Sequence, residues 1–274
     1  MEKRSSNFNL EKLESAEDTQ HLASSLNTTI HSAMHDLRSP LNVIKPYVDF
    51  LKKIDDSEKQ EAILDRMKNA VEKMEVLINK FVKYSDLICE SNPAVETILF
   101  KDIFQQVCRD IKYQYLHVEH DIKLLDESQD SPFSFPPKYL TLILRILLDN
   151  SFKYRSPERS LKVQISVSVI HDDLMIEMKD NGMGFPECFS FEEAFVPFAK
   201  NASPSRGAGL GLASLRYMIQ KNRGEVYGQS SADGTAFIIK LKPYPVFNSD
   251  HPHQSSTTDK DLEYKDRLGI TMVS

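Results

Sequence analysis

The sequence has no long apolar segment. A run of about eighteen apolar residues, the length that crosses a bilayer as a helix, does not occur anywhere in the 274 residues. The first residues, Met-Glu-Lys-Arg-Ser-Ser-Asn-Phe, contain no apolar core of the kind found in a signal peptide. These absences predict a soluble, cytoplasmic protein with no membrane span of its own.

Cysteine and excess positive charge are also scarce. The three cysteines, Cys89, Cys108 and Cys188, are far apart and show no metal-ligand spacing, so we expect reduced core or surface thiols. The 34 basic residues are outnumbered by 40 acidic ones, which argues against nucleic-acid binding because no positive excess is available to neutralise phosphates. The chain length allows one large or two modest domains.

Helical periodicity dominates the first third of the chain. It predicts one amphipathic helix over about 19–54 and a second from Ser57 onward, with Ser57 as N-cap and Gln60 completing a capping box. The apolar stripe of the first helix consists of Leu22, Leu26, Ile30, Ala33, Leu37, Leu41, Ile44, Val48 and Leu51. That of the second consists of Ile63, Met67, Ala70, Met74, Leu77, Phe81, Tyr84 and Ile88. Its alternating steps of four and three are typical of a coiled-coil seam.

Two such helices joined by the polar turn Asp55–Ser57 form an antiparallel hairpin. One hairpin cannot cover both of its apolar stripes. A second copy would cover them in a four-helix bundle, so we predict a homodimer. The alternative is a two-helix arm that packs against the rest of its own chain.

The remainder of the chain mixes strands and helices. Short alternating segments predict strands at about 96–100, 121–125, 161–170, 174–179, 225–230 and 235–241. Helices are predicted at about 101–115, 138–154 and 209–221. The elements alternate without regular parallel crossovers, which favours an α+β sandwich.

Composition divides the chain into four parts. Ser91-Asn92-Pro93 ends the second helix and marks the main boundary. The predicted parts are a flexible lead at 1–18, the helical hairpin at 19–92, the α/β sandwich domain at 93–243 and a disordered tail at 244–274.

A histidine and an aspartate stand side by side in the first predicted helix, within Met34-His-Asp-Leu-Arg-Ser-Pro-Leu41. His35 lies off the apolar stripe, so its ring is expected to face solvent or another domain, where a nitrogen is able to accept a group. Asp36 is placed to hold the tautomer of the ring or to take its proton. Pro40 removes a backbone N–H one turn later and is expected to bend the helix. Taken alone, the same residues also describe a histidine on an ordinary solvated helix face.

A polar turn closes the apolar helix predicted at 138–154, in the segment Leu147-Leu-Asp-Asn-Ser-Phe-Lys-Tyr154. The amide oxygen of Asn150 suits Mg²⁺, and Lys153, one turn on, suits a phosphate. An ordinary helix C-terminus, where a lysine complements the dipole, has the same composition. At this level both interpretations stay open.

Two glycine-rich segments follow. In Lys179-Asp-Asn-Gly-Met-Gly-Phe185 the glycines permit close approach of the backbone to a flat ligand, with Asp180 as an acceptor at the end of a strand. Ordinary turns after strands are often similar. Arg206-Gly-Ala-Gly-Leu-Gly-Leu212 opens a helix, where exposed N–H groups and the helix dipole favour a phosphate.

Together these segments resemble, in order, the motifs of the sensor histidine kinases of two-component systems. The resemblance covers about residues 20–242: the H-box at 35–41, the N-box at 147–154, the G1 box at 179–185, the F-box at Phe195–Phe198 and the G2 box at 206–212. It implies a dimerisation and phospho-acceptor hairpin followed by an ATP-binding domain of the GHKL (Bergerat) type. Hsp90, gyrase and MutL share the later boxes but have no such hairpin.

The resemblance assigns roles on the hairpin and on the metal. His35 would accept the phosphoryl group, Asp36 would be the base, and Ser39 would occupy the position used to dephosphorylate a partner. Asn150 would hold Mg²⁺.

The resemblance also assigns the ATP contacts. Asp180 would accept a hydrogen bond from the adenine amino group and so select adenine over guanine, and residues 200–206 would form a mobile lid. The other predicted contacts are Lys153, Tyr154, Gly182, Gly184, Phe198, Lys200, Arg206, Gly207, Gly209, Leu210, Gly211 and Leu212.

The implied function is an ATP- and Mg²⁺-dependent kinase that phosphorylates His35 and passes the phosphoryl group to the receiver domain of a response regulator. Its signal would come from a separate sensor protein or from another part of a longer chain. Ile146 departs from the family, since many members carry asparagine there, and this favours the alternative of an ATP-binding scaffold or phosphotransfer adaptor with little autokinase activity. A serine kinase of the anti-sigma type is a third reading, but it would not need the hairpin.

Overall fold

The computed structural model describes residues 34, 37–54, 56–90, 93–128, 131–186, 189–197 and 209–244. The predicted lead at 1–18, the first part of the first helix, and all of the predicted tail beyond Tyr244 lie outside the described residues. So do His35 and Asp36. Within the described ranges, none of the helices combines the length and the apolar character needed to span a membrane.

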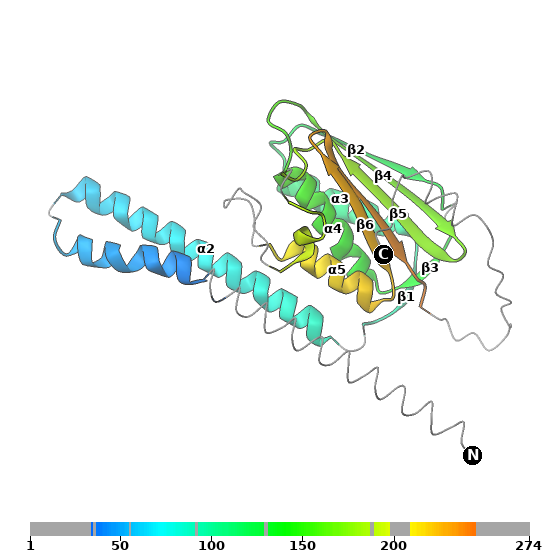
Figure 1. The fold of residues 1–274 in the computed structure, drawn as a ribbon, viewed down its shortest axis with the longest axis horizontal. Helices are drawn as coiled ribbons and strands as arrows, with labels where there is room; N and C mark the ends of the chain where they lie inside the picture. The colour runs from blue at the N-terminus through cyan, green and yellow to red at the C-terminus, as the bar shows by residue number, and fades with distance from the viewer. Residues whose placement is uncertain are drawn as a thin grey trace, which may run out of the picture. The chain divides into compact units, whose positions relative to one another are not determined.

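Two helical segments come first along the described chain. Residues 37–51 are helical, through both Pro40 and Pro46, and α2 spans Ser57–Cys89 (Figure 1). The predicted pair of helices with a short turn between them is therefore confirmed over these residues.

The N-cap of α2 differs from the prediction. Asp56, not Ser57, caps the helix: its Oδ1 accepts hydrogen bonds from the backbone N–H groups of Glu58 at 3.1 Å and Lys59 at 3.3 Å. A carboxylate at this position satisfies two free helix donors and also complements the dipole. Ser57 is instead the first helical residue.

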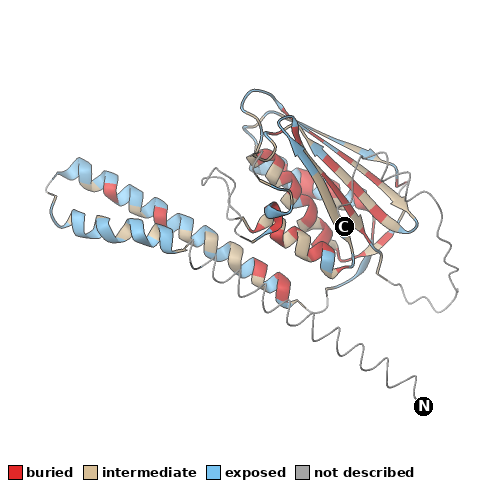
Figure 2. Cartoon of the chain, viewed as in Figure 1, coloured by how far each residue is buried: buried red, intermediate tan, exposed pale blue. Residues whose placement is uncertain are grey.

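The predicted seam of α2 is turned away from solvent. Each of its residues is buried or half-buried, and Ile63, Ala70, Tyr84 and Ile88 are the buried ones. Much of the surface of the two helices is nevertheless exposed (Figure 2). It includes large apolar side chains seven residues apart, namely Val43 and Phe50 in the first segment and Leu64, Val71 and Ile78 in α2. Heptad spacing of exposed apolar residues is typical of a surface that packs against further helices.

A mixed sheet of five strands follows, in the order β2-β4-β5-β7-β6. The strands are β2 (His120–Asp126), β4 (Leu161–Ile170), β5 (Asp173–Asp180), β6 (Glu225–Ser231) and β7 (Gly234–Leu241). Strands β2 and β4 are parallel, and the other neighbours are antiparallel. The predicted hairpins β4–β5 and β6–β7 are confirmed. His171 and Asp172 make the first turn with φ values of 50° and 69°, which the tight two-residue hairpin geometry requires.

Three helices lie together on one face of the sheet (Figure 1): α3 (Phe100–Gln114), α4 (Pro137–Lys153) and α5 (Gly211–Lys221). The buried residues of the helices and of the sheet belong to one hydrophobic core, and both layers carry such residues (Figure 2). A short 3-10 turn, η1 (Glu193–Phe195), contacts α5. The predicted α+β sandwich is confirmed.

Helix α4 forms the centre of this core. Proline at its first position suits the helix start, because the missing N–H has no partner there. Its buried residues are Tyr139, Leu140, Ile143, Leu144, Leu147, Leu148, Ser151 and Phe152. The helix is thus anchored over its whole length, and Ser151 in its last turn bonds Asp180 at the end of the central strand β5.

One short strand was not predicted. Residues 131–137 contain three prolines and lie outside every predicted strand, but Phe133–Phe135 forms β3 and pairs antiparallel with β1 (Glu96–Ile98). Both phenylalanine side chains are buried, at 4% and 0% exposure. Burial of two aromatic rings outweighs the flanking prolines, which lie outside the three paired residues.

Core packing of α4 gives a testable prediction. We expect Leu144→Ala to lower the free energy of unfolding by about 2–5 kcal/mol, because it removes a fully buried side chain and leaves a cavity. Leu125→Ala, at a side chain that is 47% exposed, is the control and should change it by less than about 1 kcal/mol. Urea denaturation followed by circular dichroism measures both, and equal losses would contradict the central place of α4 in the core.

Candidate functional site

A cleft of about 450 Å³ opens at the end of α4. Nine predicted site residues line it: Asn150, Lys153, Tyr154, Asp180, Gly184, Gly209, Leu210, Gly211 and Leu212. The last turn of α4, the loop after β5 and the start of α5, which are far apart in the sequence, therefore meet at one place.

The other predicted residues are placed differently. Gly182 contacts Asp180 but does not line the cleft. Ser39 is an exposed residue of the helical segment 37–51. Phe198, Lys200, Arg206 and Gly207 lie outside the described residues, as do His35 and Asp36.

Lys153 is already engaged within α4. Its Nζ forms an ion pair with the carboxylate of Asp149, one turn earlier. The Tyr115 hydroxyl donates a hydrogen bond to Asp149 Oδ1 at 2.6 Å. Burial and the adjacent Asp149 carboxylate raise the pKa of Tyr115, so this hydroxyl stays protonated and remains a donor. Asp149 therefore holds Lys153 at the wall of the cleft.

The side chain of Asn150 is available to a ligand. Within the described part of the chain no hydrogen bond involves its amide group, although the residue lines the cleft. An amide oxygen is a hard ligand that fits Mg²⁺, which keeps several waters and binds substrate phosphates with one or two protein ligands. The donor set at the end of α4 thus fits a magnesium ion that is shared with phosphates.

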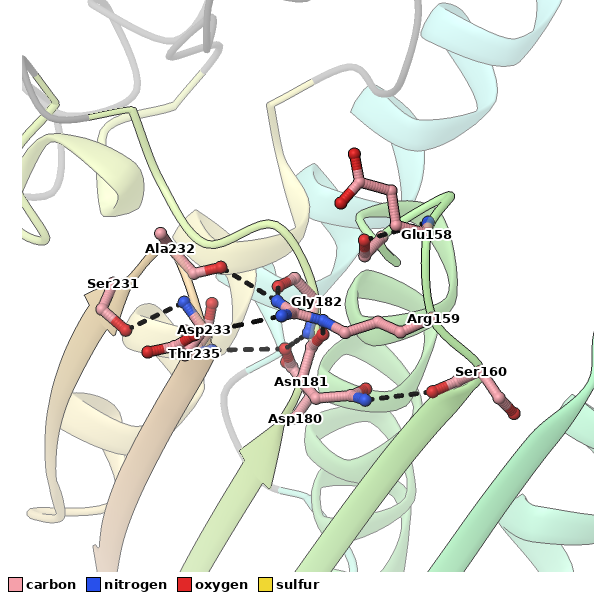
Figure 3. A network of polar contacts seen from close by, with 11 residues as sticks. Glu158, Arg159, Ser160, Asp180, Asn181, Gly182, Ser231, Ala232, Asp233 and Thr235 are labelled. Atoms are coloured by element: carbon pink, nitrogen blue, oxygen red, sulfur yellow. Dashed lines mark hydrogen bonds and ion pairs between the residues drawn. The ribbon is translucent and has the colours of Figure 1, made fainter.

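Asp180, at the end of β5, is held by three donors. Its Oδ1 accepts hydrogen bonds from the backbone N–H groups of Gly182 at 2.8 Å and Thr235 at 3.2 Å (Figure 3). Its Oδ2 accepts one from the Ser151 hydroxyl at 3.0 Å. A carboxylate offers about four acceptor positions, so one position remains for a ligand.

Two glycines are required by the close packing around Asp180. A Cβ at Gly182 would lie 2.7 Å from the carbonyl oxygen of Tyr154 and 2.9 Å from Asp180 Oδ1. Gly184 has φ of +68°, and a Cβ there would lie 1.9 Å from the carbonyl oxygen of Ser231. Only glycine fits at these positions.

The start of α5 faces the cleft with its backbone. Gly209, at φ +65°, turns the chain, and α5 begins at Gly211. The first N–H groups of a helix have no intrahelical partner, and together with the dipole they favour an anion. Leu210, between the two glycines, is buried against Tyr84 and Ile88 of α2.

The cleft carries more positive than negative charge. Lys80, Lys83, Arg145 and Lys153 line it, against Asp149 and Asp180. Burial, and then the nearby charge of Lys153, lower the pKa of Lys80. An anionic ligand in the cleft would relieve this repulsion between like charges.

Sequence reasoning missed several residues of the site. Ser151 lies inside a motif that was recognised, yet its hydrogen bond to Asp180 depends on the packing of α4 against β5. Thr235 contributes only its backbone N–H, which no side-chain pattern reveals. Arg145 lies one turn before Asp149 on α4. The spacing of four residues predicts that the two side chains share a face of the helix.

Comparison with known families agrees with this geometry. Residues 136–245 match the model described as "Histidine kinase-, DNA gyrase B-, and HSP90-like ATPase". The mixed sheet with helices on one face and the polar cleft at the end of α4 therefore form an ATPase domain of this class. Residues 25–89, which include His35, match the "His Kinase A (phospho-acceptor) domain". The chain belongs to the family of sensor histidine kinases.

Among curated proteins, the chain is 26% identical over 220 residues to "Signal transduction histidine-protein kinase ArlS" of Staphylococcus aureus (strain USA300), covering 77% of this chain and 47% of that protein. It is 22% identical over 220 residues to "Sensor protein kinase WalK" of Staphylococcus epidermidis (strain ATCC 35984), covering 77% and 36%. The chain thus spans less than half of the length of these two relatives.

Solved structures share the fold. Histidine kinase ThkA, in its complex with response regulator protein TrrA, is similar with a TM-score of 0.65 and 16% identity over 86% of this chain and 67% of that chain. Histidine kinase AdeS of Acinetobacter baumannii gives a TM-score of 0.57 and 19% identity over 77% and 98%.

The packing around Asp180 leads to a second prediction. We expect Gly182→Ala to lower the free energy of unfolding by about 1–3 kcal/mol, because the new methyl group overlaps two oxygen atoms that are fixed by their own hydrogen bonds. At Gly211 the nearest atom to an added Cβ, Ile146 Cγ2, is 3.5 Å away, so Gly211→Ala should be neutral or stabilising by up to about 1 kcal/mol. Urea denaturation measures the free energy of unfolding of both variants. A larger loss in Gly211→Ala than in Gly182→Ala would contradict the close packing around Asp180.

Proposed function

We propose that the chain is an ATP-dependent protein-histidine kinase that phosphorylates its own His35 and passes the phosphoryl group to an aspartate of a response regulator. The observation that carries the proposal is that one chain holds a phospho-acceptor match at 25–89 and a cleft in which Asn150, Asp180 and the glycine-rich start of α5 converge. In this proposal the hairpin predicted at 19–92 accepts the phosphoryl group, and the domain predicted at 93–243 binds ATP.

ATP is the nucleotide that this cleft suits. The acceptor position left on Asp180 complements the amino group of adenine, whereas guanine would place a carbonyl oxygen against the carboxylate. The phosphates would lie toward Lys153 and the first N–H groups of α5, where positive charge gathers. In this proposal the flanking contacts come from Tyr154, Gly184, Phe198 and Leu212. Gly207 belongs to the phosphate-binding turn, and Lys200 and Arg206 form part of a lid.

Magnesium would be held by Asn150 and by the phosphates of the nucleotide. When bound, it neutralises charge on the β- and γ-phosphates. The residues of the chain supply orientation: Asp180 fixes the base, and the wall of the cleft fixes the phosphates relative to His35.

Transfer joins the γ-phosphorus to a nitrogen of His35 as its bond to the bridging oxygen breaks, and ADP leaves. Asp36 accepts the proton of the other ring nitrogen, so that the ring remains neutral. The phosphoryl group then moves to the carboxylate of a receiver domain that binds along the hairpin. Ser39, one turn from His35, is the candidate for positioning the water that hydrolyses the aspartyl phosphate of the response regulator, which releases inorganic phosphate and restores the carboxylate.

We also propose that the working form is a homodimer. The exposed heptad side chains of the two helical segments support it, because one hairpin leaves them in water. A second hairpin packed in a four-helix bundle would bury them. A sensor protein, or a further part of a longer chain, would then favour one conformation of this bundle over another.

The second candidate function is an ATP-binding scaffold with little autokinase activity. It is favoured by Ile146, an apolar residue that lines the cleft where many family members carry a polar amide. A scaffold would bind ATP through Asp180 and Asn150 without labelling His35.

Labelling with ATP distinguishes the kinase hypothesis from the scaffold hypothesis. Incubation of the protein with γ-labelled ATP and Mg²⁺ should give an acid-labile, base-stable label, and His35→Gln should abolish it because the acceptor nitrogen is lost. His117→Gln, in the 93–243 region, is the matched control and should keep the label. Nucleotide binding without label would favour the scaffold, and an acid-stable label would indicate a serine acceptor.

Asn150→Ala tests the metal site. Without its one proposed protein ligand for Mg²⁺, ATP affinity in the presence of Mg²⁺ should fall by about tenfold or more, with no change in molar mass by light scattering. Isothermal titration calorimetry measures the affinity, and Asn79→Ala, at an exposed position of α2, should leave it unchanged. Full labelling of His35 in Asn150→Ala would show that Asn150 is not the ligand.

A further inference from the structure

Arg159 lies outside every motif, in the connection between α4 and β4, yet it bonds the loop that carries Asp180. Its Nε donates to the carbonyl oxygen of Asn181 at 2.7 Å, and its Nη2 donates to that of Gly182 at 2.7 Å (Figure 3). Nη2 also donates to the carbonyl oxygen of Ala232, in the β6–β7 turn, at 2.9 Å. One guanidinium group therefore joins two loops that are about fifty residues apart in sequence.

The two loops that Arg159 joins adjoin the backbone groups that hold Asp180 Oδ1. The N–H groups on Asp180 Oδ1 come from Gly182, in the first loop, and from Thr235, the second residue of β7 and three residues after Ala232. Arg159 thus bonds the carbonyl oxygens of the segments whose N–H groups hold the carboxylate. Movement of either segment would change the direction of the acceptor position that remains on Asp180.

The contacts to carbonyl oxygens are the strong part of this network. Hydrogen bonds from a charged donor are stronger than neutral ones, and the planar guanidinium offers its donors in a fixed fork. The ion pair with Asp233 is the weak part: Nη1 lies 3.9 Å from Asp233 Oδ1, and the aspartate side chain is 96% exposed. Water screens such a pair, so it contributes little.

We propose that Arg159 is a positioning residue of the nucleotide site, which sets the orientation of Asp180 and thereby the preference for adenine. The proposal rests on the function proposed above, because it concerns the same cleft. Arg159 does not line the cleft; it acts through the backbone of Asn181, Gly182 and Ala232.

The test compares the binding of ATP and GTP to the full chain in the presence of Mg²⁺ by isothermal titration calorimetry. With Arg159→Ala, the Kd for ATP should rise by about tenfold, as expected for the loss of charge-assisted hydrogen bonds. The preference for ATP over GTP should fall by about threefold or more, because a less fixed carboxylate discriminates less between the bases. A merely structural role would weaken both nucleotides equally.

Three variants control the result. Asp233→Ala removes only the exposed ion pair and should change neither quantity. Lys123→Ala removes one positive charge on β2, two strands away from β5, and should also be neutral. Arg159→Lys keeps the charge without the fork of donors, so it should recover only part of the affinity; full recovery would overturn the geometric role.

Hydrogen exchange on the nucleotide-free protein tests, without relying on ATP, whether Arg159 holds the two loops in place. In Arg159→Ala, exchange should become faster at the amides of Gly182 and Thr235, while amides of α3 should keep their wild-type rates. Unchanged exchange, or an unchanged ATP-to-GTP ratio in a wild-type protein that binds ATP, would overturn this inference and leave the kinase proposal standing. A wild-type protein that binds no ATP would overturn both.

Discussion

Helix α4 is buried along one side from Tyr139 to Phe152, and this burial determines where polar groups can lie around it. A helix so constrained cannot rotate or slide without exposing leucine and isoleucine side chains to water. Its last turn therefore presents Asp149, Asn150 and Lys153 to the cleft in a fixed register. The polar site is a consequence of the apolar packing that precedes it in the chain.

Asp180 provides the second fixed point. Its carboxylate accepts hydrogen bonds from α4 through Ser151, from its own loop through Gly182 and from β7 through Thr235. Three separate elements thus converge on one acidic group at the end of β5. A carboxylate satisfied in this way keeps its direction, which is what recognition of a flat base with a single amino group needs.

Strong local periodicity explains what the sequence predicted well. The helices α2, α3 and α4, the β4–β5 hairpin and the β6–β7 hairpin follow from apolar spacing along each element and from turn residues. Strand β3 was missed because three residues between prolines carry too little pattern, and its pairing with β1 depends on tertiary contacts. Ser57 was chosen as a cap over Asp56 because both residue types cap helices and only the geometry decides between them.

The same distinction applies to the site. Asn150, Lys153, Asp180 and the glycines of 209–211 were found because the side chain or its absence is the signal. Thr235 and Arg159 were not, since one acts through its backbone and the other bonds only backbone carbonyl oxygens. Interactions of this kind leave almost no trace in residue type or spacing, and only coordinates reveal them.

The ion pair between Lys153 and Asp149 means that the cleft carries its own counter-ion. An anion that arrives at Lys153 does not meet a bare cation; it must exchange places with a carboxylate that remains one helical turn away. When the anion departs, the lysine returns to its internal partner. The net attraction of Lys153 for any anion is therefore the difference between that attraction and the one to Asp149 that it replaces.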